Sequence, residues 1–120
     1  MSFQEELESI CQHVPGCQSV VVMNLDGIVV GRQDNAESEL DIEILLVELT
    51  SSLKQALQAL VSIQGGEMAE FSILFDKGSL VIRLLEDEHF VAVLLQPEAL
   101  VGRGRYALRR HAQPLVKELF

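Results

Sequence analysis

The sequence of 120 residues predicts a single α+β domain whose elements follow the order α-β-β-α-β-β-β-α. Hydrophobic residues make up 48% of the chain, which is enough to build a core and argues against disorder. Three segments carry apolar residues at spacings of three and four, as helices do. Five shorter segments rich in Val, Ile, Leu and Phe lie between turn signals, as strands do. No repeat, low-complexity tract or linker interrupts the chain, so we expect residues 1–120 to form one domain.

A helix and a strand hairpin are predicted at the start of the chain. Ser2 and Glu5 have the spacing of a capping box, and the Pro-Gly pair at 15–16 ends the helix. Its apolar stripe consists of Phe3, Leu7, Ile10, Cys11 and Val14. The next segments, CQSVVVMNL and IVVGR, are predicted strands, because the Asp-Gly pair at 26–27 between them is a strong hairpin signal.

The longest predicted element is a helix from about residue 39 to residue 62, which Ser38 or Asp41 would cap. Its main apolar stripe consists of Leu45, Leu49, Leu53, Ala56 and Leu60. Four more residues widen this stripe: Leu40, Ile44, Val47 and Leu57. A helix that is apolar over more than half of its circumference is buried on two sides. Either a second layer of the domain or a second copy of the chain would cover it. Because only two other helices are predicted, we expect self-association.

Three further strands and a last helix complete the prediction. The strands are the segments EMAEFSILF, SLVIRLLED and FVAVLLQ, and Pro97 closes the last of them. The final helix begins near Glu98, and Pro114 is expected to kink or restart it. The apolar seam of this helix consists of Val101, Gly104, Leu108, Ala112, Leu115 and Leu119.

The stretch ALVGRGRYALRR, residues 99–110, is the main chemical motif of the sequence. A phosphate-binding loop would need a Walker-type spacing or a βαβ unit after the glycines, and this stretch has neither. We interpret Gly102 and Gly104 as sites where the last helix packs closely on the sheet, which would offset their low helix propensity. The arginines are expected on the outer face in two pairs, Arg103 with Arg110 and Arg105 with Arg109.

The distribution of charge restricts the choice of partner. The formal net charge of −9 argues against nucleic-acid binding, because the phosphate backbone would repel most of this surface. Residues 1–60 carry ten acidic and two basic side chains, whereas residues 98–120 carry five basic and two acidic ones. An anionic partner is therefore expected to meet the C-terminal segment. The candidate residues for partner binding are Arg103, Arg105, Arg109 and Arg110.

The sequence offers little for metal, cofactor or membrane chemistry. Cys11 and Cys17 are its two cysteines, and we interpret them as reduced thiols in buried or half-buried positions. Three scattered histidines lack the spacing of zinc ligands, and no nucleophile-and-base motif is recognisable. We therefore expect no metal, no cofactor and no catalytic residue. With neither a signal peptide nor an apolar run near the roughly 20 residues of a membrane span, the protein is expected to be cytoplasmic.

Several features together resemble a known family. They are the hairpin GCQSVVVMNLDGIVVGR, the long apolar central helix, the proline that ends the last strand, and the pattern G-x-x-R-Y-x-L-R-R from Gly102 to Arg110. With these features, essentially the whole chain resembles the Roadblock/light-chain-7 family. Within that family it is most similar to the prokaryotic branch that includes the MglB-type partners of small Ras-like GTPases.

This resemblance implies a five-stranded antiparallel sheet with the long helix on one face and the two terminal helices on the other, as in profilin-like folds. It also implies a homodimer in which the third strands pair edge to edge and the long helices pack together. The segment 67–75 would then be an edge that the partner copy satisfies. The expected dimer residues are Leu40, Ile44, Val47, Ser51, Met68, Phe71, Ile73 and Phe75. Alternatively, these residues form the ordinary core of a monomer.

For function, the resemblance implies a non-enzymatic homodimeric regulator or adaptor of a small Ras-like GTPase, with a GTPase-activating or scaffold role. An arginine finger is conceivable from the last helix, although MglB-type stimulation is understood to act by ordering the GTPase. The alternative is a general signalling or motor-complex scaffold that binds a different protein. A small-molecule sensor or enzyme is a third class, which no motif in the sequence favours.

Overall fold

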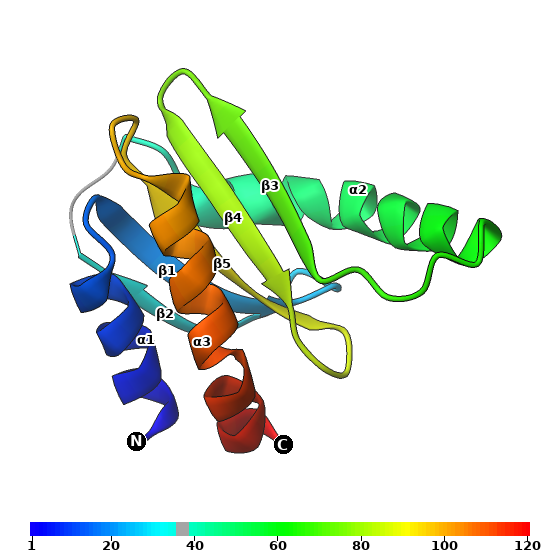
Figure 1. Ribbon diagram of the computed structural model, residues 1–120, viewed down its shortest axis with the longest axis horizontal. Coiled ribbons are helices and arrows are strands. Elements are labelled where there is room, and N and C mark those ends of the chain that lie inside the picture. The colour runs from blue at the N-terminus through cyan, green and yellow to red at the C-terminus, as the bar shows by residue number, and fades with distance from the viewer. Residues whose placement is uncertain (36–38) are drawn as a thin grey trace.

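The computed structural model describes residues 1–35 and 39–120, and within these ranges its helices and strands follow the predicted order (Figure 1). In chain order the elements are α1 (Phe3–His13), β1 (Cys17–Asn24), β2 (Val29–Asp34), α2 (Ile42–Ser62), β3 (Glu70–Phe75), β4 (Gly78–Leu84), β5 (His89–Leu95) and α3 (Val101–Leu119). The strands pair antiparallel in one sheet of order β2-β1-β5-β4-β3. Strands β2 and β3 are therefore the two edges.

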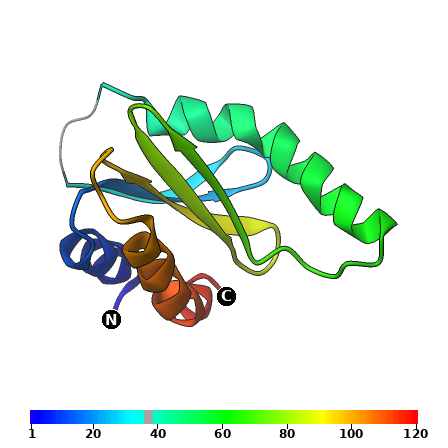
Figure 2. The same ribbon diagram turned by 45° about the horizontal axis from the view of Figure 1, so that its top comes forward.

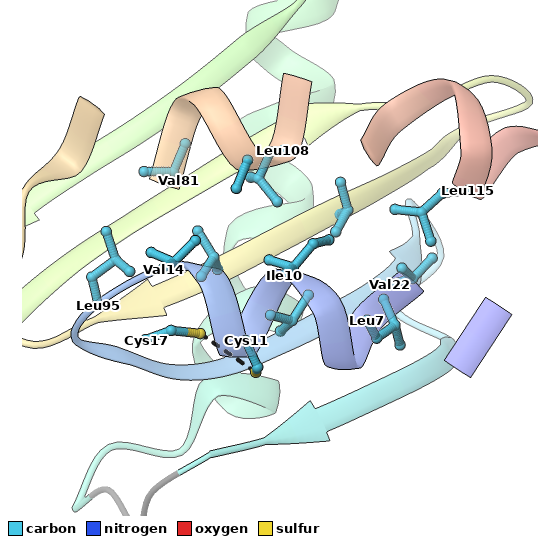
Figure 3. Packing of buried hydrophobic residues seen from close by; sticks show 14 residues of the cluster. Leu7, Ile10, Cys11, Val14, Cys17, Val22, Val81, Leu95, Leu108 and Leu115 are labelled. Atoms are coloured by element: carbon cyan, nitrogen blue, oxygen red, sulfur yellow. Dashed lines mark hydrogen bonds between the residues drawn. The ribbon is translucent and has the colours of Figure 1, made fainter. Parts of the chain in front are cut away.

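Helices cover both faces of this sheet. α2 lies on one face, and α1 and α3 lie side by side on the other (Figures 1 and 2). Successive residues of β1 alternate between the two layers: Val20 and Val22 pack towards α1 and α3, whereas Val21 and Met23 pack towards α2. Figure 3 shows the first of these two buried clusters, with Leu108 and other residues of α1, α3 and the sheet. The predicted fold class and arrangement of layers are confirmed.

Local signals in the sequence explain where the helices begin. The Ser2 hydroxyl accepts a hydrogen bond from the Glu5 amide at 3.2 Å, and the Ser2 amide donates to the Glu5 carboxylate at 3.0 Å, which completes the predicted capping box. Asp41 caps α2 by accepting from the Ile44 amide at 3.2 Å, while Ser38, the other predicted cap, lies outside the described residues. α3 continues through Pro114 to Leu119, so the predicted restart there is wrong.

The two glycines of α3 play different parts, and only one has the predicted role. A Cβ atom added to Gly104 would lie 3.0 Å from Leu95 Cδ1 and 3.5 Å from Val93 Cγ1 of β5, so α3 approaches the sheet closely there. Gly102 has nothing within 4 Å of an added Cβ atom. The interpretation as a close-packing site is therefore confirmed for Gly104 and wrong for Gly102, because residue 102 is on the exposed side of the helix.

Replacement of each glycine by valine separates these roles. We expect Gly104→Val to lower the free energy of unfolding by about 1–3 kcal/mol, because its side chain overfills the space over β5. The matched variant Gly102→Val should leave stability unchanged within about 0.5 kcal/mol. Urea denaturation of both variants measures the difference. Equal stability of the two would contradict close packing at Gly104.

Candidate functional site

The candidate site is the uncovered surface of α2 together with the edge strand β3. Only three of the 21 residues of α2 are buried: Ile42, Leu46 and Leu53. The buried residues lie in the first part of the helix, and the C-terminal part of α2 projects past β3 (Figures 1 and 2). Leu57 is the last residue of α2 that packs against the buried cluster, and Val61 and Ile63 beyond it are exposed.

Four apolar residues mark the projecting end of α2. Leu57 and Leu60 lie four and seven residues after the buried Leu53, on the same side of the helix, but are only half-buried. Val61 and Ile63 are 65% and 74% exposed. The apolar spacing correctly predicted Leu57 and Leu60 as part of the stripe, but Val61 and Ile63 were missed as surface candidates. The sequence did contain a signal for them, because Val61 follows Leu57 and Ile63 follows Ala59 at the helical spacing of four residues.

By length and composition, α2 is the one helix among the described residues that could also cross a membrane. The sequence did not predict this, because polar residues such as Glu48 and Lys54 interrupt the apolar run. One such helix does not by itself indicate a membrane span, since a helix that packs on the core of a soluble protein can have the same length and composition. In this structure the first part of α2 packs on the sheet through Ile42, Leu46 and Leu53.

Among residues 1–35 and 39–120, strand β3 pairs with β4 alone, and no strand lies along its other edge. Phe71 and Ile73 stand opposite Ile82 and Leu80 of β4, which belong to the buried cluster on the α2 face. Met68, Phe71 and Phe75 pack against that cluster and remain half-buried. The edge therefore offers unpaired backbone groups beside an apolar face that α2 only partly covers.

The predicted dimer residues do not all lie together. Met68, Phe71, Phe75 and Leu40 pack against the buried cluster beneath α2, and Ile73 stands between the two phenylalanines on β3. Ile44 and Ser51 are exposed on α2. Val47 lies instead by the turn between β1 and β2, because a Cβ atom added to Gly27 would be 3.6 Å from its Cγ2. This turn leads to β2, at the sheet edge opposite β3.

The four arginines of α3 are also divided between two environments. Arg105 Nε lies 2.8 Å from Glu70 Oε2, and its Nη2 donates to Ser72 Oγ at 3.2 Å, so this side chain links α3 to β3. Arg103 and Arg110 line a groove against α1, and Arg109 is exposed elsewhere. Within the described part of the chain, Arg103, Arg109 and Arg110 form no ion pair. Arg105 and Arg109 are four residues apart in the continuous helix α3 and so share one side of it, but Arg105 is engaged by β3.

The groove between α1 and α3 has a volume of about 610 Å³. Ser9 and His13 contribute to it from α1, and Arg103, Tyr106, Arg110 and His111 contribute from α3. Below it, His111 Nδ1 pairs with the Glu6 carboxylate, and both side chains are nearly buried. The groove was not predicted from the sequence, because it depends on contacts between the two ends of the chain. No group of three His, Cys, Asp or Glu side chains within residues 1–35 and 39–120 is placed to hold a metal ion.

Cys11 and Cys17 form a buried pair of free thiols, as predicted, with their sulfur atoms 3.5 Å apart (Figure 3). The hydrogen bond between them lowers the pKa of Cys11 and raises the pKa of Cys17, and burial raises the pKa of Cys17 further. The pair connects the end of α1 to the start of β1 inside the core. Burial shields both sulfurs from solvent reagents.

Comparison with solved structures identifies the family. The crystal structure of MglC from Myxococcus xanthus is 34% identical to the chain, with a TM-score of 0.73, and the match covers 98% of this chain and 99% of MglC. A Roadblock/LC7 domain from Streptomyces avermitilis superposes with a TM-score of 0.83 at 17% identity, over 99% of this chain and 98% of that domain. The chain belongs to the Roadblock/LC7 family.

Other structures share the Roadblock/LC7 fold at lower identity. The gliding protein MglB from Thermus thermophilus has a TM-score of 0.83 at 16% identity, over 97% of this chain and 87% of MglB. A profilin from Acanthamoeba castellanii has a TM-score of 0.64 at 11% identity, over 99% of this chain and all of that chain, so the profilin-like character of the fold is confirmed. No protein-family model and no curated protein sequence matches the chain.

The two thiols should behave as core groups. In native protein we expect both Cys11 and Cys17 to react slowly with a soluble disulfide reagent such as dithionitrobenzoate, because local opening must come first. In denaturant both should react at once. The absorbance of the released thiolate gives both rates. Immediate reaction of the native protein would contradict the packing of α1 against β1.

Proposed function

We propose that this protein is a non-enzymatic homodimer that regulates or serves as an adaptor for a small Ras-like GTPase. The observation that carries the proposal is the uncovered apolar surface of α2 beside the free edge of β3. Membership of the Roadblock/LC7 family and similarity to MglC and MglB support the proposal. The sequence of this chain resembles the MglB-like branch of the family, and that resemblance implies a GTPase partner.

In the proposed dimer, β3 of one protomer pairs with β3 of the other, and the projecting part of each α2 lies over the partner's sheet. The paired edges satisfy the backbone groups that β3 leaves open. The side chains at the end of α2, including Val61 and Leu57, leave water at the same time. Full burial of one such side chain is worth about 1.5–3 kcal/mol, so a few from each protomer offset the cost of association.

This arrangement leaves the outer surface of α1 and α3, on the other side of the sheet, accessible. Arg103 and Arg110 line the groove between α1 and α3, so a dimer built through α2 and β3 does not cover them. Arg103 and Arg110 stay available for a protein partner in this groove, Arg109 is exposed on α3 outside it, and Arg105 is engaged by Glu70. In this proposal a second copy of the chain, and not lipid, covers α2. The proposed location is therefore the cytoplasm and not the membrane.

A single charged substitution at the end of α2 tests the dimer. Val61 is 65% exposed in one chain, so we expect Val61→Glu to fold normally but to place a charge inside the interface. Light scattering should give twice the chain mass of 13.3 kDa for the wild type and the single mass for the variant. Phe71→Arg on β3 should also disrupt the dimer.

The control for this test is Ile28→Glu. Ile28 is 60% exposed, close to the value for Val61, but it lies in the turn between β1 and β2, away from β3. This variant should remain dimeric. A wild-type protein that is monomeric at micromolar concentration would contradict the proposed dimer, as would a dimer that Ile28→Glu disrupts and Val61→Glu does not.

Partner binding is tested by calorimetry with the small Ras-like GTPases encoded near this gene. We expect the protein to bind one of them more tightly when it holds a non-hydrolysable GTP analogue than when it holds GDP, because a regulator distinguishes the two states by its differential affinity. The Ile28→Glu variant, which should remain dimeric, should bind the GTPase with the same affinity as the wild type and serves as the control. Equal affinity for both nucleotide states, or no binding to any of these GTPases, would refute the assignment as a GTPase regulator.

A further inference from the structure

The groove between α1 and α3 is separate from the surface proposed for the dimer. It lies on the face of the sheet that α1 and α3 cover, whereas α2 covers the other face (Figure 2). Its volume of about 610 Å³ is large enough for several amino-acid residues. The groove therefore remains open whether or not the chain forms a dimer through α2 and β3.

The charge of the groove is opposite to that of the molecule. Arg103 and Arg110 line it and form no ion pair within the described residues, and His13 and His111 lie beside them. The described lining contains no aspartate or glutamate, and Glu6 beneath the groove is already paired with His111. On a protein with a net charge of −9, this groove is thus a local site for negative charge.

The spacing of the arginines indicates the shape of the ligand. Arg103 and Arg110 are seven residues apart on α3, which corresponds to about 10 Å along a helix. An extended peptide in the polyproline II conformation rises about 3.1 Å per residue with three residues per turn, so carboxylates three residues apart lie on the same side and span about 9 Å. Tyr106 lies between the two arginines in sequence and is exposed, and Gly102 leaves the rim free of a side chain.

We propose that this groove binds an extended acidic segment of a partner protein. Two carboxylates of the segment, three residues apart, meet the guanidinium groups of Arg103 and Arg110. The ring of Tyr106 packs on the backbone between them, and His13 forms the opposite wall on α1. Guanidinium groups bind carboxylates through paired, charge-assisted hydrogen bonds, which explains the use of arginine at both ends.

Fluorescence anisotropy with a synthetic peptide tests this proposal. The probe is a fluorescein-labelled Ser- and Thr-rich peptide with two glutamates three residues apart, and the control peptide has glutamines in their place. We expect the acidic peptide to bind at least about tenfold more tightly than the control, because the glutamines cannot form the two charge-assisted pairs with the arginines. Binding should weaken with added salt.

Variants of the protein locate the binding site. The double variant Arg103→Ala/Arg110→Ala should weaken binding of the acidic peptide by about tenfold or more, whereas Arg109→Ala, which removes an exposed arginine outside the groove, should change it less than about twofold. Circular dichroism and light scattering check that both variants keep the fold and the oligomeric state of the wild type. Light scattering reports on the dimer and fluorescence anisotropy reports on the groove, so the failure of one proposal is distinguishable from the failure of the other.

Three outcomes would overturn the inference. The acidic peptide fails to bind at millimolar concentration, or it binds no better than the glutamine peptide. Arg109→Ala weakens binding as much as the double variant does. Inorganic phosphate or phosphatidylserine vesicles displace the peptide, and their own binding falls more than that of the peptide in the Arg103→Ala/Arg110→Ala variant. This result would assign the groove to a free anion or a lipid surface.

Discussion

The structure depends on one constraint: a five-stranded sheet with two apolar faces must be covered by three helices. Its central strands β1, β5 and β4 are buried on both sides. On one face, α1 and α3 together cover the sheet, and Leu7, Ile10 and Leu108 belong to one buried cluster. On the other face, α2 is the one helix that covers the sheet in the described part of the chain. Since one helix is too narrow to cover five strands, part of that face and part of α2 remain uncovered.

This asymmetry divides the molecule into two surfaces with different chemistry. The α2 face ends in a free strand edge and exposed apolar side chains, which suit a second copy of the same chain. On the other side, α1 and α3 pack closely on the sheet, and the groove between them carries two arginines that form no ion pair with the described residues of this acidic molecule. Self-association and partner recognition therefore need not compete for the same residues. Arg105 joins the two regions, because it connects α3 to the edge strand through Glu70.

The sequence was sufficient for features that depend on local chemistry. Capping by Ser2 and Asp41, the turn at Gly27 and the close approach at Gly104 follow from residue type and spacing. Features that depend on contacts between distant segments could not be predicted. The pairing of Glu6 with His111 joins residues 105 positions apart. The division of the arginines and the position of Val47 beside the β1–β2 turn likewise depend on how each helix is rotated on the sheet, which apolar spacing defines only coarsely.

The central claim is that a second copy covers β3 and the end of α2. Hydrogen–deuterium exchange of the β3 backbone amides tests it most directly, because every second amide of this edge points away from β4. If the dimer forms through β3, these amides exchange slowly at micromolar protein concentration and faster after dilution to concentrations where the dimer dissociates. Rapid exchange at all concentrations, with protection confined to the amides that face β4, would contradict it.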